Sequence, residues 1–361
     1  NRGCRDQTNT YPRTGSLDDI KITRLWRPTF DQSGAGIGRI INAIWMILRW
    51  SLIALTRKPD VIIIGTDPVL SILTAIPWRI IRPKTKITHW CYDLFPEGAI
   101  SEGLLKEESP FVKLIKLLCG IAYRKCDLLV DLGSCMRSRL HKYPGVDKVK
   151  AVTIVPWALT EPPEPLKIDS SERNNIGNTK LVLMYSGNLG RFHSYMNILK
   201  LARKLRSEDI QFVFSIRGNA VQSLKNEIQK DDSNIKFIDF APLEKLQERL
   251  SVPDIHIVTL KEDWTGLATP SKFFGAIAAG RPVLFSGSPS AAVAQWIREF
   301  NLGWVLEDHN IEAIALEITE FSHNIENVQK KFPHCHKIYQ REFSETHLND
   351  EWDQELRKLF N

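Results

Sequence analysis

Short apolar runs alternate with longer segments of helical periodicity along most of the chain. In the N-terminal half the apolar runs are 61–65, 86–91, 128–130 and 151–155, and the helical segments are 37–56, 69–80, 110–124 and 134–142. Short apolar strands separated by helices are typical of a parallel sheet that helices cover on both faces. The pattern therefore predicts a Rossmann-like α/β domain in residues 1–160.

The same alternation returns in the C-terminal half, after a proline-rich and polar segment. Residues 161–178 are predicted to be a linker, and a second Rossmann-like, doubly wound domain is predicted over 179–348. Its strands are expected at 181–186, 211–216, 235–239, 255–260, 283–285 and 303–305. The amphipathic segment 349–361 is predicted to be a helix that packs back onto the first domain. Two such domains hold a ligand between them, at the carboxyl ends of the strands.

The first domain is predicted to lack its first strand–helix unit. The chain opens with a polar stretch, 1–16, and no strand, glycine turn and helix stand at its start. We expect that unit to lie upstream of residue 1.

The composition, 43% hydrophobic and 25% charged, is that of a soluble globular protein. Its charges are divided unevenly. Residues 1–160 hold 24 lysines and arginines against 14 aspartates and glutamates, whereas the remainder holds 24 against 28. This asymmetry indicates that the first half faces an anionic partner, such as a membrane surface or a phosphorylated lipid; an ordinary basic domain is the alternative.

The longest apolar run, Ile40–Leu55, is interrupted by Arg49 and is shorter than the ~20 residues that a membrane span needs. It is interpreted as a mostly buried helix, or alternatively as a helix on a membrane surface. The basic amphipathic segment 110–125 has the same two interpretations. No secretory leader is recognisable, so a cytoplasmic protein is predicted, with peripheral contact to the inner face of the membrane. Six cysteines without paired spacing predict neither a zinc site nor a disulfide framework.

The first motif that carries chemistry is SGNLGRFH, residues 186–193, between a predicted strand and a helix. Gly187, Asn188 and Gly190 form a turn whose backbone amides can approach a phosphate. Arg191 could bridge phosphate oxygens, and His193 could donate a hydrogen bond to one. The alternative is a strand–helix turn with an exposed arginine.

The second motif is the helix start Thr269–Lys272, followed by AAGRP. Thr269 is predicted to be the N-cap, Pro270 the first helical residue, and Gly280 the C-cap. Ser271 and Lys272 fall in the first turn, where a lysine opposes the helix dipole unless an anion is bound. Two such helix starts in one domain favour a nucleoside diphosphate as ligand.

Two further strand ends in this half could hold a nucleobase. Arg217 and Gly218 follow one predicted strand, and Phe240, Ala241 and Leu243 follow the next. Free backbone groups there could read a uracil edge while an arginine or apolar side chain covers its face; two surface turns are the alternative.

In the first half, Asp93 and Glu97 follow a predicted strand and are candidates for catalysis, because a carboxylate there could orient or deprotonate an acceptor hydroxyl. A solvated loop is the alternative. His256 lies within an apolar strand and is interpreted as a core histidine. No Asp-x-Asp motif occurs, so no metal site is predicted for the nucleotide, and no P-loop lysine motif is present.

Together these segments resemble a known family. SGNLGRFH, DIHIVTL (254–260) and TPSKFFGAIAAGRPVLFSG (269–287) look like the donor domain of family 4 glycosyltransferases of the GT-B fold, and DLFPEG (93–98) and IVPWA (154–158) fit the acceptor domain. The chain is most similar to bacterial members that build capsular and exopolysaccharides, including those of the cyanobacterial heterocyst envelope.

The resemblance implies metal-independent transfer of a hexose from a UDP-sugar, such as UDP-glucose, with retention of anomeric configuration. The acceptor would be a saccharide or lipid-linked saccharide in exopolysaccharide synthesis; no cofactor and no nucleic acid are expected. Gly187 and residues 269–272 would hold the diphosphate, and residues 240–243 the base. Asp93 falls where the family has acceptor-side catalytic groups.

Two departures from the family pattern concern the donor side. Many members carry two glutamates eight residues apart, the second on the ribose, whereas this chain has Leu267 and Gly275 there. The usual arginine and lysine after the donor glycine are replaced by Asn188 and His193. Two alternatives therefore stay open: a nucleotide-sugar epimerase of the same fold, and a non-catalytic membrane-associated scaffold.

Overall fold

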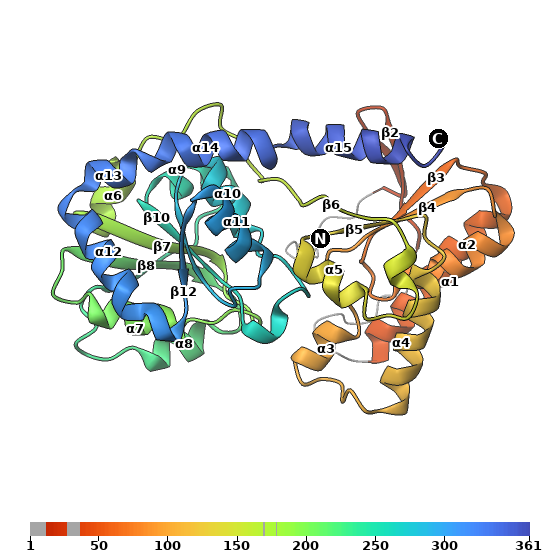
Figure 1. Cartoon of the computed structure of the whole chain (residues 1–361), viewed down its shortest axis with the longest axis horizontal. Helices are drawn as coiled ribbons and strands as arrows, with labels where there is room; N and C mark the ends of the chain where they lie inside the picture. Colours follow the sequence, from red (N-terminus) through yellow and green to blue (C-terminus); the bar gives the residue numbers. More distant parts are fainter. Residues whose placement is uncertain (1–11, 27–36, 169, 178) are drawn as a thin grey trace.

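The computed structural model describes residues 12–26, 37–168, 170–177 and 179–361. Two parallel sheets lie beside each other, each surrounded by helices, and the last helices of the chain run across the top of both (Figure 1). The predicted α/β class with two Rossmann-like halves is confirmed.

The first sheet has four parallel strands in the order β3-β4-β5-β6. They are β3 (Val61–Ile64), β4 (Lys86–Trp90), β5 (Leu128–Asp131) and β6 (Ala151–Thr153). The helices around them are α1 (Ile37–Thr56), η1 (Ser71–Thr74), α2 (Ala75–Ile81), α3 (Glu97–Ser101), α4 (Pro110–Tyr123), α5 (Ser134–Leu140) and η2 (Val146–Lys148). The helix predicted over 69–80 begins only after Leu70, whose backbone is left-handed (φ 67°), and its first turn is the 3₁₀ helix η1.

An antiparallel hairpin, β1 (Thr14–Leu17) and β2 (Ile20–Thr23), precedes this sheet and was not predicted. Both strands are mostly exposed, so they lack the alternation of apolar and polar residues by which half-buried strands are recognised. In the described residues β3 is an edge of the first sheet. The unit expected upstream of residue 1 lies outside this chain and stays a prediction.

The second sheet has six parallel strands in the order β12-β11-β10-β7-β8-β9. They are β7 (Leu181–Asn188), β8 (Ile210–Arg217), β9 (Ile235–Ile238), β10 (Ile255–Thr259), β11 (Val283–Ser286) and β12 (Gly303–Leu306). The helices are α6 (Ser170–Ile176), α7 (Met196–Lys204), α8 (Val221–Glu227), η3 (Leu243–Lys245), α9 (Leu246–Ser251), η4 (Glu262–Trp264), α10 (Lys272–Ala278), α11 (Ala292–Phe300), η5 (Asp308–Asn310), α12 (Ile311–His323), α13 (Ile325–Gln329), α14 (Lys331–Glu342) and α15 (Glu345–Arg357).

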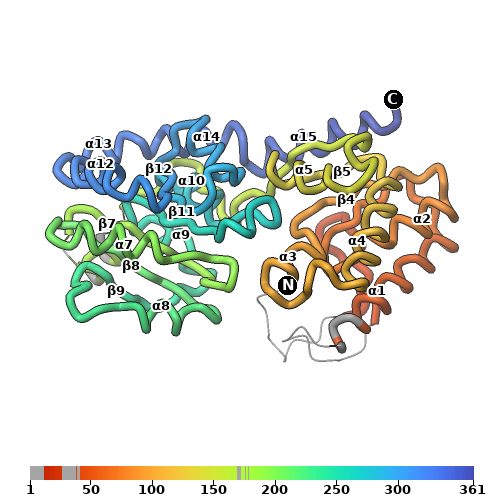
Figure 2. Tube along the Cα trace, turned by 60° about the horizontal axis from the view of Figure 1, so that its bottom comes forward, coloured from red at the N-terminus to blue at the C-terminus, as the bar shows by residue number. Residues whose placement is uncertain are grey.

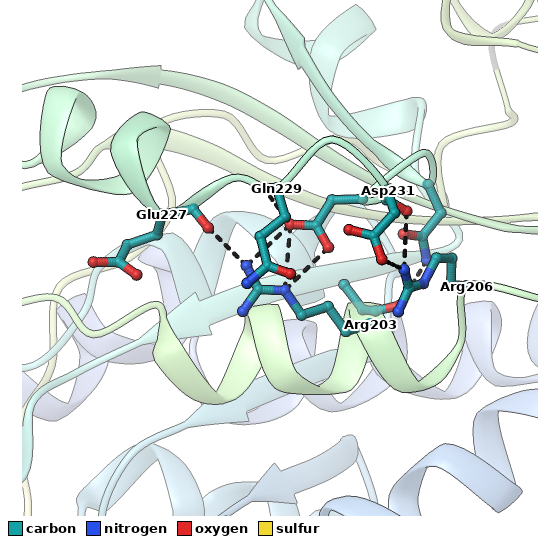
Figure 3. Close-up of polar contacts among 8 residues, drawn as sticks. Arg203, Arg206, Glu227, Gln229 and Asp231 are labelled. Atoms are coloured by element: carbon teal, nitrogen blue, oxygen red, sulfur yellow. Dashed lines mark hydrogen bonds and ion pairs between the residues drawn. The ribbon is translucent and has the colours of Figure 1, made fainter.

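A charged cluster attaches α7 to the segment between α8 and β9 (Figure 3). The guanidinium of Arg203 donates to the buried carboxylate of Asp232 at 3.0 Å and to the carbonyl of Glu227 at 2.7 Å. Asp232 also accepts from the backbone N–H of Gln229 at 2.9 Å. These bonds fix the loop that leads into β9.

The two halves are connected where the linker meets the junction of α14 and α15. A carboxylate oxygen of Glu161 accepts from the Tyr339 hydroxyl and, at 2.8 Å, from the backbone N–H of Glu345. Helix α15 begins four residues earlier than predicted and returns to the first sheet, where Trp352 lies 4.9 Å from Trp90 between ring centroids. Figure 2 shows α15 beside β4 and β5 in a second view.

Candidate donor and acceptor sites

The end of β7 and the start of α10 meet, although 84 residues separate them. Gly187 has a positive φ of 129°, and a Cβ there would lie 2.6 Å from Cε of Lys272. Only glycine therefore fits at this position while Lys272 keeps its place. The structure thus brings together the two motifs that the sequence indicates for a diphosphate.

Lys272 lies at this junction as a partly buried cation. Its Nζ donates to the carbonyl of Asn188 at 3.0 Å and lies 5.2 Å from the centroid of the Tyr185 ring. No carboxylate pairs with it anywhere in the part of the chain that the structure describes. Burial lowers the pKa of this ammonium to about 8. A cation at a helix start without a counter-ion is an arrangement that a bound anion stabilises.

The predicted cap of α10 is wrong at its start, and at its end the predicted Gly280 follows the C-cap, Ala279. The helix begins at Lys272 with Ser271 as N-cap, and no side chain caps it. Thr269 instead donates through Oγ1 to the carbonyl of Leu132, at 3.2 Å, and Pro270 precedes the cap. This contact across the halves competes with capping. At the other end Gly280 (φ 80°) donates to the carbonyl of Ile277.

His193 is buried beside this junction. Its Nδ1 lies 2.8 Å from the carbonyl of Thr259, so Nδ1 carries the proton and donates. Burial first, and then the charge of Lys272, lower the imidazole pKa to about 3. The ring is therefore neutral, and its Nε2, which has no partner in the described part of the chain, can only accept. The predicted hydrogen bond from His193 to a phosphate does not fit these contacts.

The remaining residues of the first motif lie on the loop between β7 and α7. Arg191 is exposed and has no ion-pair partner among the described residues. Gly190 is buried, and a Cβ there would lie 3.2 Å from Nδ2 of Asn188. An exposed cation, Arg191, and a partly buried one, Lys272, thus flank the same glycine turn.

The loops after β8 and β9, which the sequence indicates for a nucleobase, come together. The guanidinium of Arg217 lies 4.3 Å above the ring of Phe240. Gly218 (φ 124°) approaches the first motif, since a Cβ there would lie 2.5 Å from the carbonyl oxygen of Leu189. Ala241 is half-buried, and Leu243 begins η3 with an exposed side chain. The carboxyl ends of β7, β8 and β9 therefore form one continuous edge of the second sheet.

On the other side, the two predicted catalytic carboxylates lie apart. Asp93 lines a cavity of about 30 Å³ at the ends of β3 and β4, together with His89, Ser71 and Tyr123. Glu97 does not line it. Glu97 accepts from the Tyr143 hydroxyl at 2.6 Å, and burial first, then the charge of Glu97, raise the pKa of that phenol. Asp93 is thus placed for chemistry, whereas one oxygen of Glu97 is bonded to Tyr143 and the other, Oε2, is buried without a partner among the described residues.

His89 is the residue of this cavity that the sequence reasoning missed. Its Nδ1 donates to the carbonyl of Ile64 at 2.8 Å, and burial lowers its pKa to about 4. The available signal was a histidine on β4 four residues before Asp93. His256, by contrast, is confirmed as a core residue, since its Nε2 bonds the carbonyl of Leu250 at 3.0 Å and burial lowers its pKa to about 4.

The two halves touch beside these sites. Arg139 of α5 donates to the carbonyl of Thr265 at 2.6 Å, and a Cβ on Gly266 would lie 2.4 Å from the carbonyl oxygen of Cys135. A Cβ on Gly133 would lie 2.5 Å from the Cβ of Ala292 in the other half. The segment that leads into α10 is therefore in backbone contact with the first half.

No group of three or more potential metal-ligating side chains occurs in residues 12–26, 37–168, 170–177 and 179–361. Within the same ranges, no helix has both the length and the hydropathy that crossing a membrane requires. The five described cysteines are free thiols.

Comparison with known proteins agrees with this geometry. Residues 167–336 match the family model of glycosyl transferases group 1. The probable glycosyltransferase WbjE of Pseudomonas aeruginosa is 29% identical over 288 residues, which are 79% of this chain and 71% of that protein. The matched family segment contains the β7, β8, β9 and α10 motifs described above.

Solved structures share the fold. Sucrose-phosphate synthase of Thermosynechococcus elongatus superposes with a TM-score of 0.71 at 11% identity, over 97% of this chain and 86% of that one. HepE of Anabaena, in complex with UDP-glucose, superposes with a TM-score of 0.63 at 13% identity, over 90% and 84%. The chain therefore has the GT-B fold, and its second half is similar to glycosyl transferases group 1 over residues 167–336.

Proposed function

We propose that the protein is a retaining, metal-independent glycosyltransferase that moves a hexose from a UDP-sugar, such as UDP-glucose, to a saccharide or lipid-linked acceptor in exopolysaccharide synthesis. The similarity to glycosyl transferases group 1 supports the transferase activity, and the UDP-glucose complex of HepE supports the choice of donor. Retention and the exopolysaccharide role rest on the resemblance of the motifs to family 4.

The observation that carries the proposal is the junction of Gly187 and Lys272. The glycine turn lets the Lys272 side chain lie against the backbone, and its ammonium has no carboxylate partner in the described residues. A diphosphate there would gain a charge-assisted hydrogen bond and would restore the solvation that burial takes from Lys272.

The chemical work of this site would be to stabilise a leaving group. As the bond between the sugar and the diphosphate breaks, negative charge grows on the phosphate oxygens. Cations fixed beforehand stabilise that charge more strongly than they stabilise the bound substrate, which lowers the barrier. Lys272 is fixed by Asn188 and Tyr185, whereas Arg191 on its exposed loop could close over the phosphates from the other side.

The nucleobase of the donor would lie over the edge formed by Arg217 and Phe240, whose side chains stack on each other. The acceptor hydroxyl would approach from the cavity of Asp93 and His89. Asp93 could orient that hydroxyl or take its proton. Neutral His89, with Nδ1 held by Ile64, has Nε2 as an acceptor and can orient a hydroxyl without carrying charge.

The test is a transfer assay with UDP-hexoses and a panel of saccharide and lipid-linked acceptors, read as UDP release and as the anomer formed. We expect UDP release that depends on the acceptor and a product that keeps the anomeric configuration of the donor. Conversion of the UDP-sugar to its epimer without any acceptor would instead establish the epimerase. The absence of turnover with every donor would favour the non-catalytic scaffold.

A further inference from the structure

One segment of the second half contacts the candidate donor and acceptor motifs at the same time. This bridging segment, residues 261–267, lies between β10 and α10 and contains η4. In Figure 2 it extends in teal from the second sheet towards α3 and α5. Its contacts therefore bear on how the two candidate sites are placed relative to each other.

On the donor side, the bridging segment is attached to Phe192 of the SGNLGRFH motif. The backbone N–H of Lys261 donates to the carbonyl of Phe192 at 2.8 Å. The ring of Phe192 lies 5.2 Å from the ring of Trp264 and 4.2 Å from that of His193, measured between centroids. The glycine loop of the donor site therefore contacts Trp264 through its own aromatic residue.

On the acceptor side, the bridging segment contacts both ends of the DLFPEG motif. The backbone N–H of Leu94, the residue after Asp93, donates to the carbonyl of Leu267 at 3.3 Å. A Cβ on Gly98 would lie 3.5 Å from Cη2 of Trp264, which is an ordinary van der Waals distance. Trp264 therefore lies between the donor loop and the acceptor motif.

Trp264 is enclosed by these contacts, since only 9% of it is exposed. The backbone on either side of it is also attached to the first half. The carbonyl of Asp263 accepts from the hydroxyl of Ser101 at 3.2 Å, and Arg139 donates to the carbonyl of Thr265. Closely packed side chains transmit a displacement instead of absorbing it. A displacement of the donor loop is therefore passed through Trp264 to the acceptor motif.

We propose that Trp264 is a positioning residue, which holds the acceptor motif, and with it Asp93, in a fixed place relative to the donor loop. The inference rests on the proposed function, because it requires a diphosphate at the donor loop and an acceptor beside Asp93. Trp264 acts through Phe192 on one side and through Gly98 on the other. A diphosphate that orders the glycine loop would in this way also order the group that receives the acceptor.

The first experiment measures transfer kinetics and UDP affinity for Trp264→Leu. We expect kcat to fall by about tenfold or more, because small displacements of reacting groups are costly. UDP affinity should change far less, because the contacts of Lys272 remain. Trp304→Leu is the matched control: it removes a similarly buried tryptophan (7% exposed) of β12, bonded to Glu317, and should keep the wild-type kcat. Equal losses of kcat in the two variants, measured below both melting temperatures, would overturn the proposal.

A second variant addresses the contact from its other side. Gly98→Leu places a side chain where Trp264 lies and should also lower kcat, although leucine favours a helix more than glycine does. In Gly98→Leu/Trp264→Leu the new side chain fills the space that the indole leaves. The double variant should therefore lose less kcat than the product of the two single losses. Single losses that simply multiply would contradict a direct contact between the two positions.

Hydrogen exchange measures the same coupling without turnover. UDP should slow the exchange of the backbone amides of residues 94–101 by about fivefold or more in the wild type and in Trp304→Leu, but not in Trp264→Leu. Binding of UDP to the wild type without this protection would overturn the inference alone. Failure of UDP to bind the wild type would overturn the proposed function, and this inference with it.

Discussion

Lys272 combines a helix start, partial burial and the lack of a carboxylate partner among the described residues. Each of these features makes the positive charge of Lys272 less favourable. The negative charge of a bound diphosphate would offset the effect of all three. Substitutions of single residues therefore test the proposed chemistry most directly.

UDP affinity should depend on pH through Lys272. Burial lowers the pKa of its ammonium to about 8, so the free protein loses this proton as the pH rises through that value. The charge that binds phosphate is fully present below pH 8, and affinity should fall above it. Calorimetric titration with UDP at a series of pH values measures this. Lys272→Ala should bind about tenfold more weakly, ~1.4 kcal/mol, and lose the dependence. Lys337→Ala, on the exposed side of α14, is the control.

Asp93 and Glu97 form a matched pair for testing the acceptor side. Asp93 lines the cavity with His89, whereas Glu97 is bonded to Tyr143. Asp93→Asn should lower kcat by about tenfold or more while sparing UDP affinity, because general base or orienting groups contribute to that extent. Glu97→Gln should leave kcat unchanged. Steady-state kinetics and UDP titration of both variants decide this, and equal losses in both parameters for Asp93→Asn would indicate a structural role.

At the scale of elements, the buried Arg281 joins three segments. Its guanidinium donates to the carbonyls of Pro253, Ala279 and Ser251 at 2.8, 3.1 and 2.8 Å, and it lies 4.0 Å from the ring of Phe332. The arginine of the AAGRP motif therefore holds α9, α10 and α14 together.

Replacing Arg281 should destabilise the protein. In Arg281→Met three buried carbonyls lose their donor, which costs about 3 kcal/mol. Urea unfolding measures the change, and Arg298→Met, at an exposed arginine of α11, should change stability by less than about 0.5 kcal/mol. A loss of similar size in both variants would contradict this account.

The cluster of Figure 3 should make stability depend on acidity. The hydrogen bond from Arg203 holds the pKa of Asp232 below its usual value of 3.8. A carboxylate with a lowered pKa stabilises the fold above its unfolded pKa, and this contribution is lost as the pH falls through the lowered value. Asp232→Asn should therefore be less stable than the wild type at neutral pH, and the difference should shrink below about pH 4. Unfolding curves at both pH values test this.

In the whole molecule, the proposed function requires the two halves to keep their relative position around the site. Gly266 has a positive φ of 76° and lies against the carbonyl of Cys135 in the other half. A side chain at this position therefore acts on the contact between the halves as well as on its own backbone.

Gly266→Ala should push the halves apart and lower kcat/KM by about tenfold or more, because small displacements of reacting groups are costly. Gly103→Ala is the matched control: its φ is 72°, but nothing lies within 4 Å of the added methyl group. Both variants bear the same backbone strain, and only the first meets the other half. Small-angle scattering and acceptor kinetics measure the effect, and equal behaviour of the two variants would refute it.

The order and type of most elements, the glycine that follows the C-cap of α10 and the core role of His256 could all be predicted from the amino-acid sequence. These features depend on periodicity and on backbone preferences within a few residues, which a local pattern expresses directly. The hairpin β1–β2 escaped prediction because its strands are too exposed to show that pattern.

Which side chains contact each other depends on the tertiary packing and could not be predicted from the sequence pattern. Thr269 bonds Leu132, 137 residues away, instead of capping its own helix, and His193 bonds Thr259, 66 residues away, and so becomes an acceptor. Glu97 turns to Tyr143, whereas Asp93 enters the cavity. A polar group takes the best partner that the packed chain brings to it, and burial then sets its protonation state. Neither the partner nor the burial is contained in the local spacing of residues.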